Sequence, residues 1–315
     1  MYKNTHKNLL NWYRMNGRHN LPWRLTNDPY KVWVSEVMLQ QTQVKTVLER
    51  FYFPFLETFP TLQDLANATE DEVLKKWEGL GYYTRCRNLH KTAKLCQTAL
   101  PLTVDELVAL PGIGQSTAHA VAAFAYKTPV PIMDANVKRI LYRVFGVKEA
   151  KDKELWEMAY KLFDDKYPYN YNQALMDVGA TVCQAKSVAC DGCPFQSVCK
   201  AYLDDPLLYP TKKVKKATPK RIRHIVVHEK KQKFALRQRT TKLLHGLWGF
   251  VEHEQVQQAT VIGEIVHKYT HFHLYATVYH TSKEVTNVSW FTLAEIQTLA
   301  LSGADHKILA LLESA

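Results

Sequence analysis

Two acidic residues stand in surroundings that change how readily a carboxyl group ionises, and the first is Glu36. It lies in the segment PYKVWVSEVMLQQ, where helical spacing puts it on one face with Val32, Trp33 and Leu39. A carboxylate among such side chains is costly to bury unless it is paired or protonated, so we expect a raised pKa. Glu36 is therefore a candidate general acid. A partly exposed glutamate at the rim of the helix fits the same periodicity.

The second acidic residue is Asp134, which follows the apolar run 130–133. Val137, Ile140 and Leu141 come next at helical spacing, so Asp134 is expected at the N-cap of a helix. A plain structural cap is the simpler interpretation of Asp134 taken alone.

A glycine hairpin, LPGIG at 110–114, precedes a predicted helix from Gln115 to about Tyr126. Gly112 and Gly114 can adopt positive φ and leave no Cβ in the way, so backbone N–H groups can face a phosphate. The helix that follows adds the positive end of its dipole to such an anion site. A glycine turn between two core helices is the alternative.

Four cysteines gather within seventeen positions, with six, two and five residues between them: Cys183, Cys190, Cys193 and Cys199. Such an array is a strong metal signal in a reducing compartment. Zinc sites of four cysteines usually show two close pairs, whereas this array has one pair and two single residues. Four thiolates in a compact loop also suit a [4Fe–4S] cluster, and the spacing alone leaves both metals open. Cys86 and Cys96 fall on a predicted helix and are expected to be interior residues.

The charge balance favours a polyanionic partner, because 41 Lys and Arg face 30 Asp and Glu, a net charge of +11. No apolar stretch approaches the length of a membrane span, and the first residues lack the apolar core of a signal peptide. We therefore expect a cytoplasmic, nucleoid-associated protein whose thiols stay reduced and bind metal rather than form disulfides.

Residues 1–203 are predicted to be helical, with caps at Asp28, Thr61 and Thr69. Residues 204–221 form a basic, proline-containing linker, and 222–315 an α+β domain. The expected helices are 7–14, 29–53 as one helix or a pair, 61–66, 69–77, 83–99, 103–109, 115–126, one starting at 134, 151–163 and 170–182. The expected strands are 222–228, 234–237, 261–267 and 272–280, followed by helices 293–299 and 307–312.

A glycine-rich turn at 79–83 presents Leu80 and Tyr82 next to each other. An exposed leucine and tyrosine on a rigid turn suit insertion into a base stack. Packing beneath a loop is the alternative.

Together these segments resemble the MutY-type adenine DNA glycosylases of the endonuclease III superfamily. The resemblance covers nearly the whole chain, and several independent motifs occur in the family's order: LPWR (21–24), SEVMLQQTQV (35–44), GLGYYTRCRNLH (79–90), LPGIGQSTA (110–118), MDANVKR (133–139) and NQALMDVGATVC (172–183). It implies an all-α, two-lobed helix-hairpin-helix domain over 1–203, with a [4Fe–4S] loop at 183–199. The hairpin would bind a DNA phosphate, and the family assignment raises the cluster above zinc.

The resemblance also implies a reaction, hydrolysis of the N-glycosidic bond of adenine opposite 8-oxoguanine or guanine in double-stranded DNA, by a monomer. Glu36 would protonate the adenine, and Asp134, kept ionised by the helix dipole, would stabilise the positive sugar. The base must be flipped out of the duplex to be reached. By the same resemblance, Trp23, Arg24 and Gln173 line the base pocket, Gln41 and Tyr82 support the distorted stack, and Asn136 faces a phosphate.

One position separates the subclasses of this superfamily. Bifunctional relatives carry a lysine two residues after the last hairpin glycine, where this chain has Ser116. Without that amine we expect a monofunctional enzyme that leaves an abasic site. Ala135 departs from the family's usual glycine, and we expect it to be tolerated. A glycosylase with lyase activity and a non-catalytic, metal-containing DNA-binding protein are the competing hypotheses.

The C-terminal domain resembles the Nudix-like domain of the same family, through LLHGLWGF (243–250) and Tyr269-Thr270-His271. The latter stands where the family typically has Phe-Ser-His and recognises 8-oxoguanine. A Nudix hydrolase would need a dense set of glutamates, whereas only Glu252, Glu254 and Glu264 lie nearby. We therefore expect this domain to recognise the damaged base and not to be a second enzyme.

Overall fold

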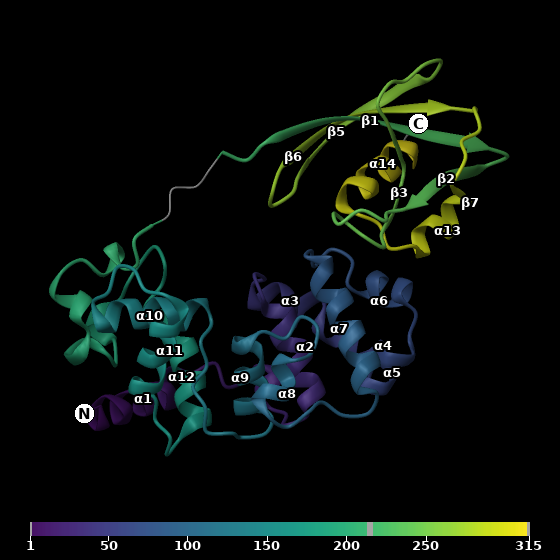
Figure 1. Ribbon diagram of the computed structural model, residues 1–315. Helices are drawn as coiled ribbons and strands as arrows, with labels where there is room; N and C mark the ends of the chain where they lie inside the picture. The colour runs from purple at the N-terminus through teal and green to yellow at the C-terminus, as the bar shows by residue number, and fades with distance from the viewer. Residues whose placement is uncertain (1, 213–216, 314–315) are drawn as a thin grey trace. The chain divides into compact units, whose positions relative to one another are not determined.

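The computed structural model describes residues 2–212 and 217–313, which form two compact units (Figure 1). The first unit combines the chain up to Gln41 with the segment that begins at Thr98, and the second combines Thr42–Gln97 with the C-terminal segment. The prediction of an all-α domain followed by an α+β domain is confirmed. Among the helices of the described residues, none is long and apolar enough to cross a bilayer.

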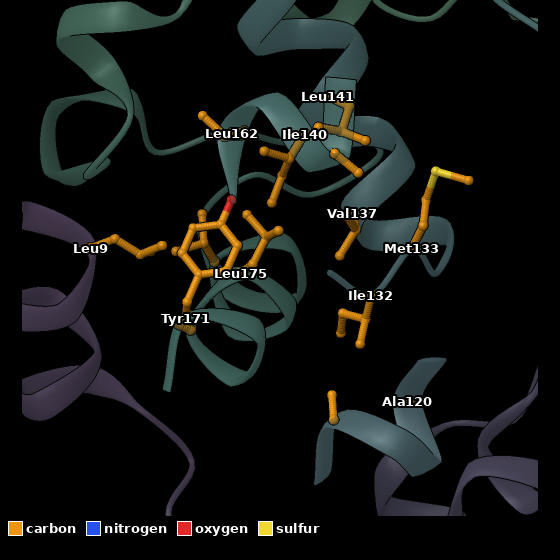
Figure 2. Packing of buried hydrophobic residues seen from close by; sticks show 14 of the residues in the cluster. Leu9, Ala120, Ile132, Met133, Val137, Ile140, Leu141, Leu162, Tyr171 and Leu175 are labelled. Atoms are coloured by element: carbon orange, nitrogen blue, oxygen red, sulfur yellow. The ribbon is translucent and has the colours of Figure 1, made fainter. Parts of the chain in front are cut away.

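The first unit is built entirely from helices around one apolar core. Figure 2 shows side chains of this core, such as Leu9, Val137 and Tyr171, converging from separate helices. Its elements are α1 (Lys3–Asn16), η1 (Pro22–Arg24), α2 (Pro29–Leu39), α8 (Val104–Val108), α9 (Gln115–Phe124), α10 (Ala135–Phe145), α11 (Asp152–Leu162) and α12 (Pro168–Thr181), followed by the short turns η2 (Cys190–Gly192), η3 (Gln196–Val198), η4 (Lys200–Leu203) and η5 (Pro206–Leu208).

The helical part of the second unit starts after a break in the segment that we expected as one helix or a pair. Gln41 has φ of 58°, in the left-handed region, so α2 ends at Leu39 and the chain restarts at Val44. The predicted caps at Asp28, Thr61 and Thr69 are confirmed, each with a side-chain oxygen on a backbone N–H of the first turn. The helices are α3 (Val44–Arg50), α4 (Tyr52–Thr58), α5 (Leu62–Asn67), α6 (Glu70–Lys76) and α7 (Tyr83–Cys96).

The C-terminal part of the second unit is a mixed sheet in the order β3-β2-β1-β6-β5, with β4 on β1 and β7 on β2. The central pair β1–β6 is parallel and the other pairs are antiparallel. The four predicted strands are confirmed, while three short ones were missed. The elements are β1 (Lys220–Lys230), β2 (Lys233–Gln238), β3 (Trp248–Gly249), β4 (Val251–His253), β5 (Thr260–Lys268), β6 (His273–Thr281), β7 (Ser289–Phe291), α13 (Leu293–Thr298) and α14 (Gly303–Glu313).

The linker predicted for 204–221 lies only partly within the described residues, since 213–216 fall outside them. Its first half contains the turn η5, and its last two residues, Lys220 and Arg221, belong to β1. The strand starts two residues earlier than expected because Lys220 and Arg221 continue the parallel ladder with His273 and Leu274. Ladder pairing, which composition does not report, decides this boundary.

A buried ion pair connects α14 to the sheet. Asp305, with 1% of its side chain exposed, binds Arg239 through two hydrogen bonds of 2.9 and 3.0 Å. The same carboxylate accepts from the backbone N–H of Phe250 at 3.2 Å and from the hydroxyl of Ser302 at 2.5 Å. The Arg239 guanidinium, with only 18% of its side chain exposed, is costly to leave without this partner.

We predict that Asp305→Ala lowers the free energy of unfolding by about 3–5 kcal/mol, because it strands the Arg239 charge. The matched control is Glu252→Ala, which removes the half-exposed partner of Arg223 at 3.4 Å and should stay within about 1 kcal/mol of wild type. Urea unfolding followed by circular dichroism measures both. Equal small losses in the two variants would contradict the importance of the buried pair.

Candidate active site

Glu36 projects from α2 and is half-buried. Its exposure is intermediate between the two alternatives from the sequence, a buried residue on the apolar face and a partly exposed one at the rim of the helix. Burial raises its pKa, the charge of Asp134 raises it further, and the charge of Arg24 lowers it, with a result of about 7. A carboxyl group with this pKa holds a proton in a large fraction of molecules at neutral pH. Glu36 can therefore donate a proton, as the sequence predicted.

Asp134 is the N-cap of α10, also as predicted. Its carboxylate accepts from the backbone N–H of Val137 at 2.7 Å and from the side-chain amide of Asn136 at 3.1 Å. Burial nevertheless raises the pKa of Asp134 above its ordinary value, against the lowering by these hydrogen bonds and by Arg139. The helix terminus is therefore not the dominant influence on this carboxyl group, contrary to our expectation from the dipole alone.

The three expected pocket residues lie in the same unit as the two carboxyl groups. Trp23 is buried, and the Arg24 side chain is only 3% exposed. Both Nη atoms of Arg24 bind the carboxylate of Asp177, at 2.7 and 2.8 Å, while its buried Nε–H has no hydrogen-bond partner among the described residues. Gln173 is 3% exposed, and its Oε1 likewise lacks a partner within the described part of the chain.

The residues that carry this unpaired donor and this unpaired acceptor are both buried, and one side chain connects them. They are linked through Tyr169, whose hydroxyl donates to the carbonyl oxygen of Arg24 at 3.1 Å and which also hydrogen-bonds Gln173. Burying a polar group without a partner is unfavourable, by about 1–3 kcal/mol. Such groups persist in native proteins where water or a ligand satisfies them, or where they serve catalysis.

Asp177 and Tyr169 are site residues that the sequence reasoning missed. Asp177 stands inside the apolar helix pattern of α12, and its side chain is 0% exposed. An acid within an apolar pattern was the available signal, and it was the same signal that identified Glu36. The partners of Asp177 lie about 150 residues away in the sequence, which hid its role.

The glycine hairpin joins α8 to α9 and uses its two glycines differently. Gly112 has φ of 75°, which requires glycine, whereas Gly114 has φ of −83°. A Cβ on Gly114 would meet no atom within 4 Å, so this side of the turn is open to a ligand. The Ser116 hydroxyl donates to the carbonyl oxygen of Met133 at 2.6 Å and so fixes the hairpin next to Asp134.

Asn136 connects the start of α10 to α12. Arg139 donates to its side-chain oxygen at 2.9 Å and to the carbonyl oxygen of Cys183 at 2.8 Å. A Cβ on Gly179 would lie 2.6 Å from the Cβ of Asn136, so glycine is required for this approach. Ala135, where the family usually has glycine, is exposed, and its tolerance stays a prediction.

The four cysteines of the 183–199 loop line one cavity. Arg143 is buried beside them, and its Nη1 donates to the Cys183 sulfur at 3.1 Å and to the Gln184 carbonyl oxygen at 2.8 Å. Among the described residues, no group of three or more His, Cys, Asp or Glu forms a site for a single metal ion. The four thiols line one cavity, and the guanidinium at the Cys183 sulfur would favour a negatively charged group there.

The second unit holds the remaining predicted residues. Leu80 is 6% exposed, so the structure favours the packing alternative and the expected exposed wedge is wrong. Tyr82 is half-buried with φ of 50°, and it lines a cavity of about 410 Å³ together with Tyr269, Thr270 and His271.

The loop Tyr269-Thr270-His271 joins β5 to β6, and the backbone N–H of Tyr269 donates to Phe272 at 2.9 Å. Thr270 and His271 are exposed, so His271 is not a buried residue of the turn. In the first unit, Gln41 is also exposed, in its left-handed conformation.

Comparisons with known proteins agree on both parts of the chain. Residues 34–164 match the family described as HhH-GPD superfamily base excision DNA repair protein, and residues 223–311 match the NUDIX domain. An adenine DNA glycosylase of Buchnera aphidicola subsp. Baizongia pistaciae is 41% identical over 209 residues, which are 64% of this chain but 59% of the relative's length. That of subsp. Acyrthosiphon pisum is 31% identical over 334 residues, 96% of this chain and 95% of the relative.

Solved structures show the same fold for the helical part. A thermostable thymine-DNA glycosylase superposes with a TM-score of 0.58 at 26% identity, covering 63% of this chain and 94% of that one. An endonuclease III–DNA complex superposes with a TM-score of 0.54 at 20% identity, covering 62% and 92%.

We predict that Asp134→Asn lowers the pKa of Glu36, because the variant removes the second cause of the upward shift. Asparagine is also a good N-cap, so α10 should be preserved. The pKa should remain above the ordinary glutamate value, since burial, the larger cause, persists. Titration of ¹³C-labelled glutamate carboxyl groups by NMR, with Glu36→Gln to assign the signal, measures the shift. An unchanged midpoint would show that the two carboxyl groups do not interact.

Proposed function

The chain belongs to the adenine DNA glycosylases of the HhH-GPD superfamily, enzymes of base excision DNA repair, and on this premise we propose that it removes adenine paired with 8-oxoguanine or guanine and leaves an abasic site. One observation carries the proposal. A half-buried carboxyl group with a pKa of about 7, Glu36, lies in one unit with an unpaired buried donor on Arg24 and an unpaired buried acceptor on Gln173.

The chemistry follows from the two carboxyl groups. Adenine leaves poorly as an anion, so Glu36 gives its proton to a ring nitrogen as the bond between C1′ and the base breaks. The bonding electrons go to the base, and positive charge develops on the sugar. The ionised Asp134, fixed by the N–H of Val137, stabilises that charge until water adds to C1′ and releases a proton, which restores the acid form of Glu36. The products are adenine and an abasic site.

Recognition of adenine uses the unpaired groups. The exocyclic amino group donates to Oε1 of Gln173, and a ring nitrogen accepts from Nε of Arg24. Each contact satisfies a polar group that burial would otherwise leave unpaired. A base with a different arrangement of hydrogen-bond donors and acceptors would make neither contact. The base reaches this pocket only when it is flipped out of the duplex, because its reacting atoms are otherwise stacked.

The net charge of +11 and the glycine hairpin support the proposed binding to DNA. The open side of Gly114 admits a phosphate close to the backbone N–H groups at the start of α9. Asn136 stands at the start of α10, a second helix end suited to a phosphate. Binding of this kind weakens steeply with salt, because counterions are released from the DNA.

Ser116 supports the monofunctional assignment. A Schiff base with the sugar needs an amine, and the hydroxyl here is already donated to Met133.

The test is a labelled duplex with adenine opposite 8-oxoguanine, scored for strand breaks with and without alkali. Breaks only after alkali are expected; direct breaks would mean a lyase, and none at all would mean a binding protein. Glu36→Gln is the matched control, since it keeps the shape but cannot donate the acid proton.

The C-terminal domain is proposed to read the base opposite the adenine. The exposed Thr270 and His271 and the cavity shared with Tyr82 support this role. Glu252 is engaged with Arg223 at 3.4 Å, and Glu254 and Glu264 are exposed. The role as a reader, in place of a second enzyme, stays a prediction from the sparse glutamates of this domain.

We predict that His271→Ala reduces capture of the adenine–8-oxoguanine pair by roughly tenfold to a hundredfold, the effect of losing one polar contact of about 1–3 kcal/mol. Excision from the plain adenine–guanine pair should change much less, because the flipped adenine is identical in both. Parallel single-turnover rates at low enzyme concentration measure the two losses. A melting curve controls for folding, and an equal loss on both substrates would refute the reader assignment.

The four cysteines are proposed to hold a [4Fe–4S] cluster, supported by their common cavity and by the Arg143 hydrogen bond to Cys183. Such a group, when bound, cross-links the loop through four thiolates. In this chain the loop is also held by Arg139 through the Cys183 carbonyl oxygen.

Replacing Cys193 with serine should abolish the brown colour, lower the iron content and weaken DNA affinity, because one ligand is lost. Cys86→Ser, a buried cysteine in α7, is the matched control and should keep its iron. Iron and zinc analysis of both purified variants measures this. Full iron content in the Cys193 variant, or zinc in the wild type, would contradict the assignment.

A further inference from the structure

Asp177 is a buried acid that the proposed mechanism does not use. Its side chain is 0% exposed, a position that is unfavourable for a carboxylate unless every lone pair is satisfied. Arg24 fills two positions through Nη1 and Nη2, while Arg18 donates through its backbone N–H at 2.9 Å and its Nε at 2.7 Å. Burial alone would raise the pKa of Asp177, but the bonds from Arg24 and Arg18 hold it below its ordinary value.

The geometry of the Arg24–Asp177 pair decides which N–H group of Arg24 can bind another molecule. A carboxylate that binds both Nη atoms takes the end of the guanidinium, and the Nε–H at its side is left over. That Nε–H is the buried donor that has no partner in the described part of the chain. The backbone of Arg24 is held as well, since Tyr169 donates to its carbonyl oxygen at 3.1 Å.

The charge of Arg24 also matters for the general acid. It lowers the pKa of Glu36, against burial and the charge of Asp134, which raise it. Tyr13 on α1 hydrogen-bonds the Arg24 side chain, and Tyr169 on α12 lies within reach of its charge. Burial raises the pKa of both phenols, so neither offsets the guanidinium charge at neutral pH. Asp177 is the anion bound directly to it.

We propose that Asp177 is a positioning residue, which turns the free Nε–H of Arg24 to the base and offsets the guanidinium charge that would otherwise favour the ionised form of Glu36. The inference rests on the proposed adenine excision. A residue of α12, Asp177, would then influence both the recognition of the base by Arg24 and the protonation of Glu36 on α2. Asp177 acts only through Arg24 and does not touch the substrate.

The first test is Asp177→Asn, which keeps the size of the side chain and removes its charge. Single-turnover excision from the adenine–8-oxoguanine duplex should fall about tenfold to a hundredfold, the cost of a misplaced contact group. The alkaline limb of the pH profile should move to lower pH, because the uncompensated Arg24 lowers the pKa of Glu36. Asp177→Glu, which restores the charge, should return the limb to its wild-type position.

A loss of rate with an unmoved limb in the Asn variant would overturn the proposal, since a merely structural defect lowers the rate equally at all pH values. The wild-type enzyme is measured in parallel. Absence of excision there refutes the proposed function, whereas wild-type excision with an unmoved limb in the variant refutes only the role of Asp177.

A second pair of variants keeps the test possible if Asp177→Asn does not fold. The double variant Asp177→Asn/Arg24→Gln removes both buried charges together, which is far less unfavourable than stranding one. Compared with Arg24→Gln alone, the double variant should show the same residual excision and the same pH limb, because Asp177 then has no Arg24 to act through. A further loss of excision in the double variant would overturn the proposal.

Discussion

The removal of Glu36 from water is the interaction on which the rest of the site depends. Burial is the largest cause of its raised pKa, so the acid exists only as long as α2 keeps this carboxyl group among apolar neighbours. Val32 packs in the core of the first unit, and Trp33 and Val37 on the same helix are buried as well. Gln40 adds a hydrogen bond of 3.1 Å from the end of this segment to Thr117 on α9. The packing of one helix thus sets the protonation state of the acid.

Two charges then adjust that state in opposite directions. Asp134 makes Glu36 harder to ionise, and Arg24 makes it easier. Hydrogen bonds fix both side chains: Val137 and Asn136 hold Asp134, and Asp177 holds Arg24. The Nε–H of Arg24 is left without a partner among the described residues. Preorganisation of this kind is what electrostatic catalysis requires, because nothing has to reorient when the bond breaks. In the proposed base site, the unpaired Gln173 oxygen would supply an acceptor.

Local features of the fold could be predicted from the sequence, and features decided by distant partners could not. The caps at Thr61, Thr69 and Asp134 depend on neighbours three residues away, and they were correct. The positive φ of Gly112 was likewise a local requirement. Asp177 was missed because its partners lie in a loop about 150 residues earlier in the chain.

The remaining misses have the same origin. Leu80 lies between two glycines in a short turn, and only tertiary packing buries it. Strands β3, β4 and β7 have two or three residues each, too few for an alternating pattern to appear. The influence of burial on Asp134 also depends on tertiary structure, which is why the helix dipole alone gave the wrong balance.

The pH dependence of excision by the wild-type enzyme tests the central claim most directly, that a protonated Glu36 drives the reaction. Single-turnover rates on the adenine–8-oxoguanine duplex would be measured from pH 5.5 to 9, with stability checked at each pH. The pKa of about 7 predicts a rate that is steady on the acid side and falls about tenfold per unit on the alkaline side. A rate that stays level up to pH 9 would contradict the account, because the acid form of a group with this pKa would then not be needed.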